Sequence, residues 1–432
     1  MKVTFINPNF SSSRSGDAME PLAFAVLSGL TPPDVTRVLY DERVEAVPVE
    51  EPTDLVALSV KTFTAKRAYA IAACYRARGV PVVMGGIHPS LVPEEAGLHA
   101  DAVVIGDAEG AWPMVLEDFR KGTLERTYSG GNELPLTGLV YDRLIFRGKR
   151  YLPIACVQFG RGCRYACEFC SVHSFYGNNR RTRPVEEVAS EIALLGSRRL
   201  MFVDDNFLLD SDAAKELLER IIPLRLRWVC QISIECAFDP ELLALMRKSG
   251  CMGAYVGLES LDPASLGQMK KPQNICLDYA QAIANFHENG ILVCGSFVFG
   301  YDADTPASVQ TAMEFALRNK LCLAHFNILF PAPGTRLYDR LLGERRIRFD
   351  AWWLDDDLHY GDCCFVPRRM CPGDLERAVA KARRRFNTLA SILRRALSFR
   401  TKPCGPVRFV LFLIINLVNR REIRKKQGLR FG

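Results

Sequence analysis

Three cysteines near the middle of the chain constrain its fold and chemistry more than any other feature. They lie in the segment Cys163-Arg-Tyr-Ala-Cys167-Glu-Phe-Cys170, with the spacing C-x-x-x-C-x-x-C. Three thiolates on one tight loop can bind three irons of a cubane 4Fe-4S cluster. The fourth iron then has no protein ligand and stays open to a substrate or cofactor. We therefore predict an iron-sulfur cluster with one open iron at these cysteines.

A zinc site is the alternative at the same place. The spacing Cys167-x-x-Cys170-x-x-His173 occurs in zinc-binding modules, and Cys163 would supply a third thiolate. Zinc modules are small, whereas this loop opens a long run of alternating strand and helix patterns. The context therefore favours the cluster.

The first segment, residues 1–145, has the pattern of a doubly wound, Rossmann-like α/β domain. Short β-branched runs alternate with apolar residues at helical spacing. The expected strands are 3–6, 37–40, 55–60, 82–84 and 102–105, and the expected helices are 22–30, 65–78 and 111–120. Such alternation predicts a parallel sheet with helices on both faces.

Ligands of such sheets bind beyond the carboxyl ends of the strands. The residues expected there are mostly small or polar, so that the backbone can approach a ligand. They include Ser59, Lys61, Thr62, Thr64, Gly85, Gly86, His88, Gly106 and Glu109. His88 is equally consistent with a loop residue bonded to backbone groups, and we do not assign it as a metal ligand.

Residues 146–345 repeat a strand and then a helix. The expected strands are 156–159, 200–203, 228–234, 253–258, 292–299 and 325–330. Six such units predict a partial (β/α)6 barrel, of the TIM-like kind, with its chemistry at the carboxyl ends of the strands. Before it, residues 130–155 carry the turn signals of a linker, and after it residues 346–432 are expected to be mostly helical.

Acidic residues follow two of the expected barrel strands. Asp204 and Asp205 follow the second strand, and Glu259 follows the fourth. Carboxylates there suit the ammonium and ribose hydroxyls of a zwitterionic, ribose-bearing ligand, and Phe297 and Phe299 suit its adenine. Acidic residues at strand ends are also common helix caps, so each one alone has this second interpretation.

Several segments resemble the cobalamin-dependent radical SAM enzymes, in particular their class B methyltransferases. VVMGGIHPSLVPEEA and DAVVIGDAEGAWP resemble the cobalamin-binding domain, and FVDDNF, VGLES, FVFGYDADT and LFPAPGTRLYD resemble strand-end motifs of the radical SAM barrel. The resemblance implies three cofactors: a 4Fe-4S cluster on Cys163, Cys167 and Cys170, S-adenosylmethionine (SAM), and cobalamin. It implies SAM contacts at Phe169, Asp204, Asp205, Glu259 and Phe297. It implies cobalamin contacts at Ser59, Thr62, Gly85, Gly86, His88, Gly106 and Glu109.

The loop after the first strand departs from one cobalamin-binding pattern. Folds that ligate cobalt through a histidine have a D-x-H-x-x-G loop there, whereas this chain has Asn7-Pro-Asn-Phe-Ser-Ser-Ser-Arg-Ser-Gly-Asp17. The resemblance therefore implies a corrinoid without a histidine lower ligand. A flavodoxin-like or nucleotide-binding domain without a corrinoid is the alternative, because doubly wound sheets bind many ligands.

Composition indicates a folded protein with reduced thiols. The 432 residues are 48% hydrophobic, which suffices for two or three domains with cores. The 15 cysteines are scattered, and the first residues run into a strand without a signal-peptide pattern. We therefore expect a cytoplasmic protein.

The last segment concentrates the basic residues behind the net charge of +7. Its most apolar run, residues 407–418, is broken by Arg408 and Asn416 and is shorter than the ~20 residues of a membrane-spanning helix. Peripheral contact with a membrane is one interpretation. A helix packed on the barrel with a solvated basic end is the other, and it is slightly favoured. The aromatic and acidic stretch 352–364 is expected either to close the barrel mouth over a substrate or to serve as a packing lid.

The resemblance implies C-methylation of an unactivated carbon in a small-molecule or lipid-like substrate. In that reaction the cluster and SAM generate a radical that removes hydrogen, and methylcobalamin supplies the methyl group. A cyclase or another radical reaction without methylation is the alternative, and a non-catalytic corrinoid or iron-sulfur binding protein is a third. The expected partners are the substrate and an electron donor such as flavodoxin or ferredoxin. Nucleic acid is not expected, since the barrel carries no basic-aromatic binding module that we can name.

Overall fold

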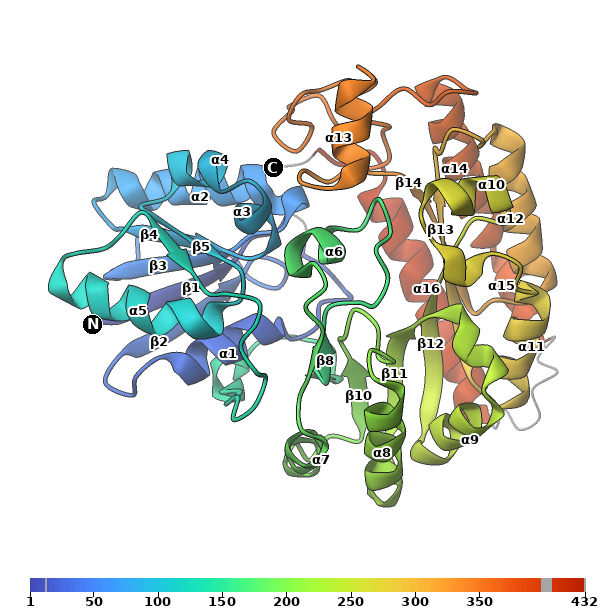
Figure 1. Cartoon of the computed structure of the whole chain (residues 1–432), viewed down its shortest axis with the longest axis horizontal. Coiled ribbons are helices and arrows are strands. Elements are labelled where there is room, and N and C mark those ends of the chain that lie inside the picture. Colours follow the sequence, from blue (N-terminus) through green and yellow to red (C-terminus); the bar gives the residue numbers. More distant parts are fainter. Residues whose placement is uncertain (12–13, 398–405, 431–432) are drawn as a thin grey trace.

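The computed structural model describes residues 1–11, 14–397 and 406–430, which form two parallel sheets surrounded by helices (Figure 1). The N-terminal sheet has the strand order β2-β1-β3-β4-β5-β6. Its strands are β1 (Lys2–Asn7), β2 (Thr36–Asp41), β3 (Leu55–Ser59), β4 (Val82–Gly85), β5 (Ala102–Ile105) and β6 (Thr127–Ser129). The strand order changes direction between β1 and β3, the place where ligands of such sheets bind. The edge strand β6 is the one that the sequence pattern did not predict.

Helices cover both faces of the N-terminal sheet. One face carries α1 (Leu22–Leu30) and α5 (Ala108–Lys121), and the other carries α2 (Ala65–Ala77), α3 (Ile87–Leu91) and α4 (Pro93–His99) (Figure 1). Two short 3-10 turns, η1 (Thr62–Thr64) and η2 (Arg143–Phe146), complete this half. Along β3, Leu55 and Ala57 pack into one apolar cluster, while Val56 and Leu58 pack into another. This alternation buries both faces and confirms the predicted doubly wound domain.

The second sheet, called the barrel sheet below, has the order β14-β13-β12-β11-β10-β7, all in parallel register. Its strands are β7 (Ala155–Val157), β10 (Arg199–Phe202), β11 (Arg227–Ile232), β12 (Cys251–Glu259), β13 (Leu292–Phe299) and β14 (Leu323–Ile328). The strands follow one another in sequence order, and β7 and β14 form the two edges. This is the predicted partial barrel, open on one side.

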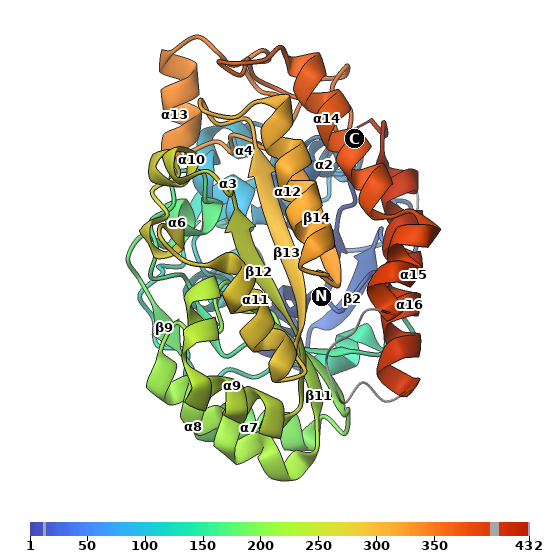
Figure 2. The ribbon, with the colours of Figure 1, turned by 90° about the vertical axis from the view of Figure 1, so that its right-hand side faces the viewer.

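Helices between these strands cover the outer face of the barrel sheet (Figure 2). They are α7 (Val185–Leu194), α8 (Ser211–Ile221), α9 (Pro240–Ser249), α10 (Pro263–Gln268), α11 (Tyr279–Glu288) and α12 (Pro306–Arg318), with the 3-10 turns η3 (Ile222–Leu224), η4 (Ile234–Phe238) and η5 (Pro272–Asn274). Aspartates cap several of them; the Asp239 carboxylate, for example, accepts from the Leu242 amide at 3.0 Å at the start of α9.

The last part of the chain is mostly helical, as predicted. It contains α13 (Arg336–Gly343), α14 (Pro372–Phe386), α15 (Leu389–Leu397) and α16 (Pro406–Lys426). The last two helices lie side by side along one edge of the molecule (Figure 2). Among the described residues, no helix is both long and apolar enough to cross a bilayer.

Candidate cofactor sites

The three cysteines lie on a loop that leaves and rejoins the barrel through a small clamp. Strand β8 (Gly160–Arg161) pairs antiparallel with β9 (Arg181–Thr182), and the loop between them carries the cysteines and α6 (Ser171–Tyr176). Gly162 has φ +88°, and a Cβ there would lie 2.5 Å from the Asn179 carbonyl oxygen. Only glycine fits such a position without strain. The close approach of Gly162 to Asn179 brings the two ends of the cysteine loop together.

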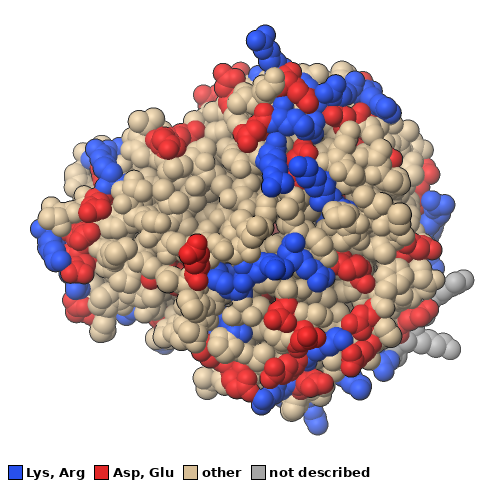
Figure 3. Space-filling view, viewed as in Figure 1, with Lys and Arg blue, Asp and Glu red and all other residues tan. Residues whose placement is uncertain are grey.

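The loop faces the N-terminal half and an electropositive surface. Helix α6 lies between the two halves of the molecule, and the Asn132 side chain donates to the Phe175 carbonyl at 2.5 Å (Figure 1). Lys and Arg side chains gather across the middle of this face (Figure 3). On the loop itself, Arg164 and Arg180 are exposed. The cysteine loop is therefore close both to the other half and to a basic surface.

The three thiols influence one another, as ligands of one cluster must. The Cys170 amide donates to the Cys167 carbonyl at 3.2 Å. Burial raises the pKa of the Cys170 thiol to about 11, and the Cys167 and Cys163 thiols add to the shift. Within the described residues, no group of three His, Cys, Asp or Glu side chains surrounds a single metal position. A cubane cluster needs no such common centre, because each of its thiolates binds a different iron.

Asp204 and Asp205 hold the backbone that leads into this loop. The Asp204 carboxylate accepts from the amides of Phe159, at 3.1 Å, and Gly160, and the Asp205 carboxylate accepts from the Gly162 amide at 3.2 Å. Burial raises the pKa of Asp204 to about 7 and that of Asp205 to about 6. In this structure both carboxylates shape the loop through its amides.

Glu259 lies at the carboxyl end of β12 beside the cysteines. Its Oε1 is 3.1 Å from Lys271 Nζ, and Lys271 in turn lies close enough to Cys167 and Cys163 for their charges to affect its pKa. Glu259 has φ +60°, a strained conformation for a residue with a side chain. A Cβ on Gly257 would lie 2.3 Å from Glu259 Oε1, so this glycine makes room for the carboxylate. Strain at a buried acid next to three thiols is typical of a functional site.

The two phenylalanines predicted to contact SAM lie in different environments. Phe169 on the cysteine loop packs edge-on against Tyr301, with ring centroids 6.5 Å apart. Phe297 is fully buried and stacks on Phe326 with centroids 5.7 Å apart, so it belongs to the barrel core. Tyr301 was not predicted; its buried hydroxyl has no hydrogen-bond partner among the described residues.

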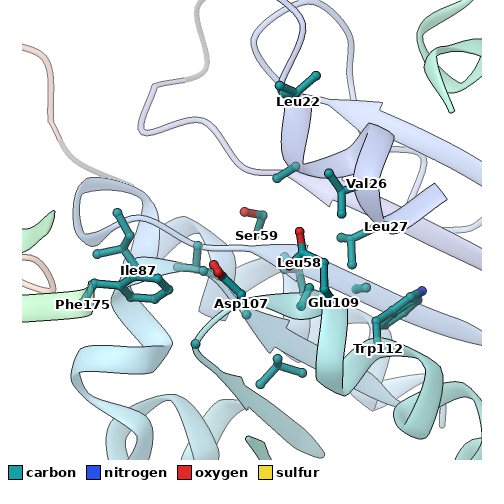
Figure 4. A pocket seen from close by; sticks show the side chains of 18 of the residues that line it. Leu22, Val26, Leu27, Leu58, Ser59, Ile87, Asp107, Glu109, Trp112 and Phe175 are labelled. Carbon is teal, nitrogen blue, oxygen red and sulfur yellow. The ribbon is translucent and has the colours of Figure 1, made fainter. Parts of the chain in front are cut away.

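A cavity of about 260 Å³ lies at the carboxyl edge of the N-terminal sheet. Figure 4 shows Leu22, Val26 and Leu27 of α1 and Trp112 of α5 along one side, with Ser59, Asp107 and Glu109 nearby. The barrel half contributes lining residues too: Gln158, Arg161, Phe175 and Tyr176. The cavity is thus an apolar slot with a few polar groups, shared by both halves, and this lining is typical of small-molecule sites.

The cavity collects most of the residues expected at this edge. It is lined by Ser59, Gly85, Gly86, Gly106 and Glu109. Gly86 has φ +102°, and a Cβ there would lie 2.9 Å from the Val60 carbonyl oxygen, so a glycine is required. Thr62 and His88 do not line the cavity.

His88 takes part in a buried contact between the two halves. Its Nε2 lies 3.1 Å from the Tyr69 hydroxyl and 3.1 Å from Glu95 Oε1, and its ring packs against Trp353. The Trp353 indole donates to Glu95 at 3.0 Å. The partners of His88 are therefore side chains, not the backbone groups suggested from the sequence. The stretch around Trp353 packs between the two halves of the molecule.

A buried ionic network joins the cavity to the cysteine loop. Arg161 on β8 donates to Glu109 Oε1 at 2.6 Å and lies 3.0 Å from Asp107 Oδ2. Arg181 on β9 donates to the same Asp107 oxygen at 2.6 Å. Sequence reasoning assigned no role to Arg161, Arg181 or Asp107, although Asp107 lies within the segment DAVVIGDAEGAWP, since the three are far apart in the chain. Arg161 on β8 and Arg181 on β9 both pair with Asp107, and only the structure shows this contact.

Two family models match the chain. The model described as the B12 binding domain matches residues 25–116, and the model described as the radical SAM superfamily matches residues 157–316. The first match contains most of the cavity lining. The second begins in β7 and contains the cysteine loop.

Relatives with established names match most of the chain. A bacteriochlorophyllide d C-12(1)-methyltransferase of Chlorobaculum tepidum is 30% identical over 413 residues, which cover 93% of this chain and 89% of that protein. A hopanoid C-2 methylase of Rhodopseudomonas palustris is 27% identical and covers 77% of this chain and 66% of that protein.

Solved structures share the fold. The radical SAM methyltransferase TsrM of Kitasatospora setae has a TM-score of 0.66 at 19% identity, over 79% of this chain and 76% of that chain. The cobalamin-dependent radical SAM enzyme OxsB has a TM-score of 0.55 at 16% identity, over 80% of this chain and 55% of that chain. Both combine the same two halves as this chain.

Proposed function

The chain belongs to the cobalamin-dependent radical SAM methyltransferases, and we propose that it joins their two cofactor sites through the buried network around Arg161. Membership confirms the expected cofactors: a 4Fe-4S cluster, SAM and cobalamin. It also confirms the expected reaction, C-methylation of a small-molecule substrate. The zinc site and the corrinoid-free domain are therefore set aside.

We propose that Cys163, Cys167 and Cys170 hold the cluster and that Glu259 and Phe169 contact SAM. The support is their position around one loop at the carboxyl end of the barrel sheet. Asp204 and Asp205 act indirectly, because their carboxylates hold the backbone amides of that loop. Together with SAM the cluster supplies a radical that removes hydrogen from an unactivated carbon, and cobalamin supplies the methyl group.

Cobalamin in this proposal occupies the cavity at the carboxyl edge of the N-terminal sheet. The glycines at 85, 86 and 106 let the backbone approach a large ring, and the Ser59 hydroxyl and Glu109 carboxylate offer polar contacts. The apolar side chains of α1 and Trp112 suit the less polar parts of the corrinoid. Thr62 and His88 do not line the cavity, and in this proposal they lie behind the residues that do.

The contact between Arg161 and Glu109 carries the proposal. Arg161 lies one residue before the turn that opens the cysteine loop, and Glu109 lines the cavity. Their hydrogen bond fixes the distance between the two sites and helps to keep water out of the space between them. Fixed placement of two reactive groups and exclusion of water are what this chain's own residues contribute to catalysis.

We propose a large, apolar, polycyclic substrate, of the tetrapyrrole or hopanoid class. The support comes from the names of the relatives, which are methyltransferases of bacteriochlorophyllides and hopanoids. The similarity to the first of them extends over nearly the whole of both proteins.

We also propose that an electron donor of the flavodoxin or ferredoxin class docks beside the cysteine loop. These donors are small acidic proteins, and the exposed residues Arg164, Arg180 and Lys270 lie on or next to the loop. Electrostatic complementarity of this kind speeds encounter between redox partners.

Product analysis tests the proposed function. Anaerobically reconstituted protein is given SAM, methylcobalamin, a reductant and either bacteriochlorophyllide d or a hopanoid. Methyl transfer yields S-adenosylhomocysteine and 5'-deoxyadenosine together with a methylated product. 5'-Deoxyadenosine alone would indicate a radical reaction without methylation, and intact SAM would indicate a binding protein. The variant Cys163→Ala is the control for cluster-dependent cleavage.

A further inference from the structure

Helix α16 packs Phe412 and Asn416 inward and also exposes apolar residues on its outer side. Asn416 is fully buried, and Glu422 is also buried. Val410, Ile414, Leu417 and Val418 are instead 40 to 52% exposed. These four residues are spaced by three and four positions, so they form one continuous stripe on the outer face of the helix. A surface helix normally has polar residues on its outer side, so an exposed apolar stripe there indicates a face that binds something.

A buried arginine fixes the helix in this orientation. Arg395 of α15 is 2% exposed, and its guanidinium lies 3.8 Å from the Phe386 ring centroid. It donates to the carbonyls of Leu321 and Cys322 at 2.8 Å and to the Asn416 side chain at 3.1 Å. Turning the apolar stripe of α16 inward would break the buried hydrogen bond between Arg395 and Asn416 and would expose Phe412, which is costly. The stripe is therefore held toward the outside.

The neighbouring helix α15 also exposes apolar residues. On α15, Leu389, Leu393 and Leu397 are spaced by four residues and are 49 to 77% exposed. The two helices run side by side along the edge of the molecule (Figure 2). We call the exposed leucines of α15 and the stripe of α16 the outer face of α15 and α16.

Basic residues continue this outer face. Arg421 and Arg424 follow Leu417 and Val418 along α16 at helical spacing and are exposed. The acidic residue of the described α15 and α16 sequences is Glu422, which is buried. A second copy of the same face would therefore bring no exposed acid to neutralise these arginines. Anionic lipid headgroups would neutralise them, while the acyl chains accept the apolar stripe.

We propose that the outer face of α15 and α16 docks the protein on the surface of an anionic bilayer. The helices lie in the interface with their apolar residues among the lipids and Arg421 and Arg424 on the headgroups. The C-terminal end of α16 also reaches the N-terminal half, since Lys426 Nζ lies 3.4 Å from Asp17 Oδ2. This proposal stands on the surface alone and does not depend on the reaction.

Sedimentation with lipid vesicles tests the proposal on the full-length protein. Vesicles of phosphatidylcholine alone are compared with vesicles that also contain phosphatidylglycerol. We expect the protein to sediment with the anionic vesicles and to be released by salt. Replacing Ile414 and Leu417 together by Gln is expected to weaken binding by roughly tenfold or more, because apolar burial is lost. Replacing Arg421 or Arg424 by Gln is expected to weaken it by roughly fivefold each on anionic vesicles.

The matched control replaces Leu98 and Leu194 by Gln. Both leucines are strongly exposed but lie on α4 and α7, away from the outer face, so binding is expected to stay unchanged. Circular dichroism melting of each variant shows that the fold is kept. The proposal is overturned if the unmodified protein stays in solution with both kinds of vesicle, or if the Ile414 and Leu417 pair binds as the unmodified protein does. A dimer in sedimentation velocity that this pair dissociates, without vesicle binding, also overturns it and identifies the face as a subunit interface.

Discussion

Arg161 donates a hydrogen bond to Glu109 at 2.6 Å, and this contact connects the clamp of the cysteine loop with the wall of the N-terminal cavity. Both side chains are largely buried, as is Asp107, the second acidic partner of Arg161. Burial raises the cost of breaking such a pair, since the remaining charges lose both water and partner. The clamp of the cysteine loop and the wall of the cavity are therefore coupled through ionic contacts.

Replacing Arg161 by Met is predicted to weaken the fold and the cavity together. The variant leaves Glu109 and Asp107 buried with fewer cationic partners, and we expect a loss of about 3–5 kcal/mol in the free energy of unfolding. Urea unfolding measures the loss, and equilibrium dialysis with hydroxocobalamin measures weaker binding. The control Arg198→Met changes an exposed arginine and is expected to stay within about 0.5 kcal/mol of the unmodified protein. Equal stability of the two variants would contradict the role of Arg161.

Replacing Cys170 by Ser is predicted to abolish cluster assembly. A serine hydroxyl stays protonated where the thiolate would bind iron, so we expect iron content near background and loss of the visible absorbance after anaerobic reconstitution. Cys74 is exposed and lies outside the loop, which makes Cys74→Ser the control with normal iron content. A full cluster in the Cys170 variant would remove this cysteine from the ligand set.

Gly162→Ala is predicted to loosen the cysteine loop. The added Cβ would meet the Asn179 carbonyl oxygen at 2.5 Å, and the residue has φ +88°. We expect a destabilisation of about 1–3 kcal/mol and faster loss of iron to a chelator. Gly97 on α4 has no atom within 4 Å of the corresponding position, so Gly97→Ala serves as the control and is expected to retain iron normally.

The titration of Asp204 is predicted to lower the free energy of unfolding as the pH rises. Burial raises its pKa from 3.8 to about 7, so in this range the folded state binds a proton that the unfolded state has lost. The contribution of Asp204 to stability is therefore full below about pH 4 and is lost progressively up to about pH 7, by as much as about 4 kcal/mol.

The variant Asp204→Asn removes this titration. We expect its free energy of unfolding to depend less on pH than that of the unmodified protein, when urea unfolding is measured at about pH 5 and about pH 7. Asp205, with a pKa raised to about 6, stays in both proteins, and its charge is a minor cause of the raised pKa of Asp204. Parallel pH profiles would show that Asp204 titrates normally.

The arrangement of strands could be predicted from the sequence because both sheets are parallel and buried. The chain visits the six barrel strands in the order in which they lie in the sheet, and the longest of them, β12 and β13, are runs of eight or nine mostly apolar residues. The short edge strand β6 and the clamp strands β8 and β9 were missed, since two or three residues carry no periodic signal. The clamp is what holds the cysteine loop closed.

Site residues that belong to a sequence motif could be predicted from the sequence. Contacts between residues far apart in the chain could not. The spacing of Cys163, Cys167 and Cys170 predicted a cluster without any structure. Phe297 was chosen for its type and place on a strand, but its position in β13 puts the ring in the core. Whether a residue lines a site or packs behind it depends on the strand register, which the sequence pattern left open.

The orientation of the C-terminal helix α16 could not be predicted from the sequence either. The run 407–418 is apolar on all sides, so its sequence does not indicate which residues face the barrel. The buried pair of Arg395 and Asn416 decides this, and it joins two helices whose side chains could not be paired from sequence. The prediction of a helix packed on the barrel describes the inner face of α16. The outer face carries the exposed apolar stripe.

Metal analysis of anaerobically purified protein tests the central claim most directly. A cluster on the cysteine loop and a corrinoid in the neighbouring cavity predict about four irons and one cobalt per chain after reconstitution with iron, sulfide and cobalamin. Zinc bound at the three cysteines, or failure to bind cobalt under any of these conditions, would contradict it.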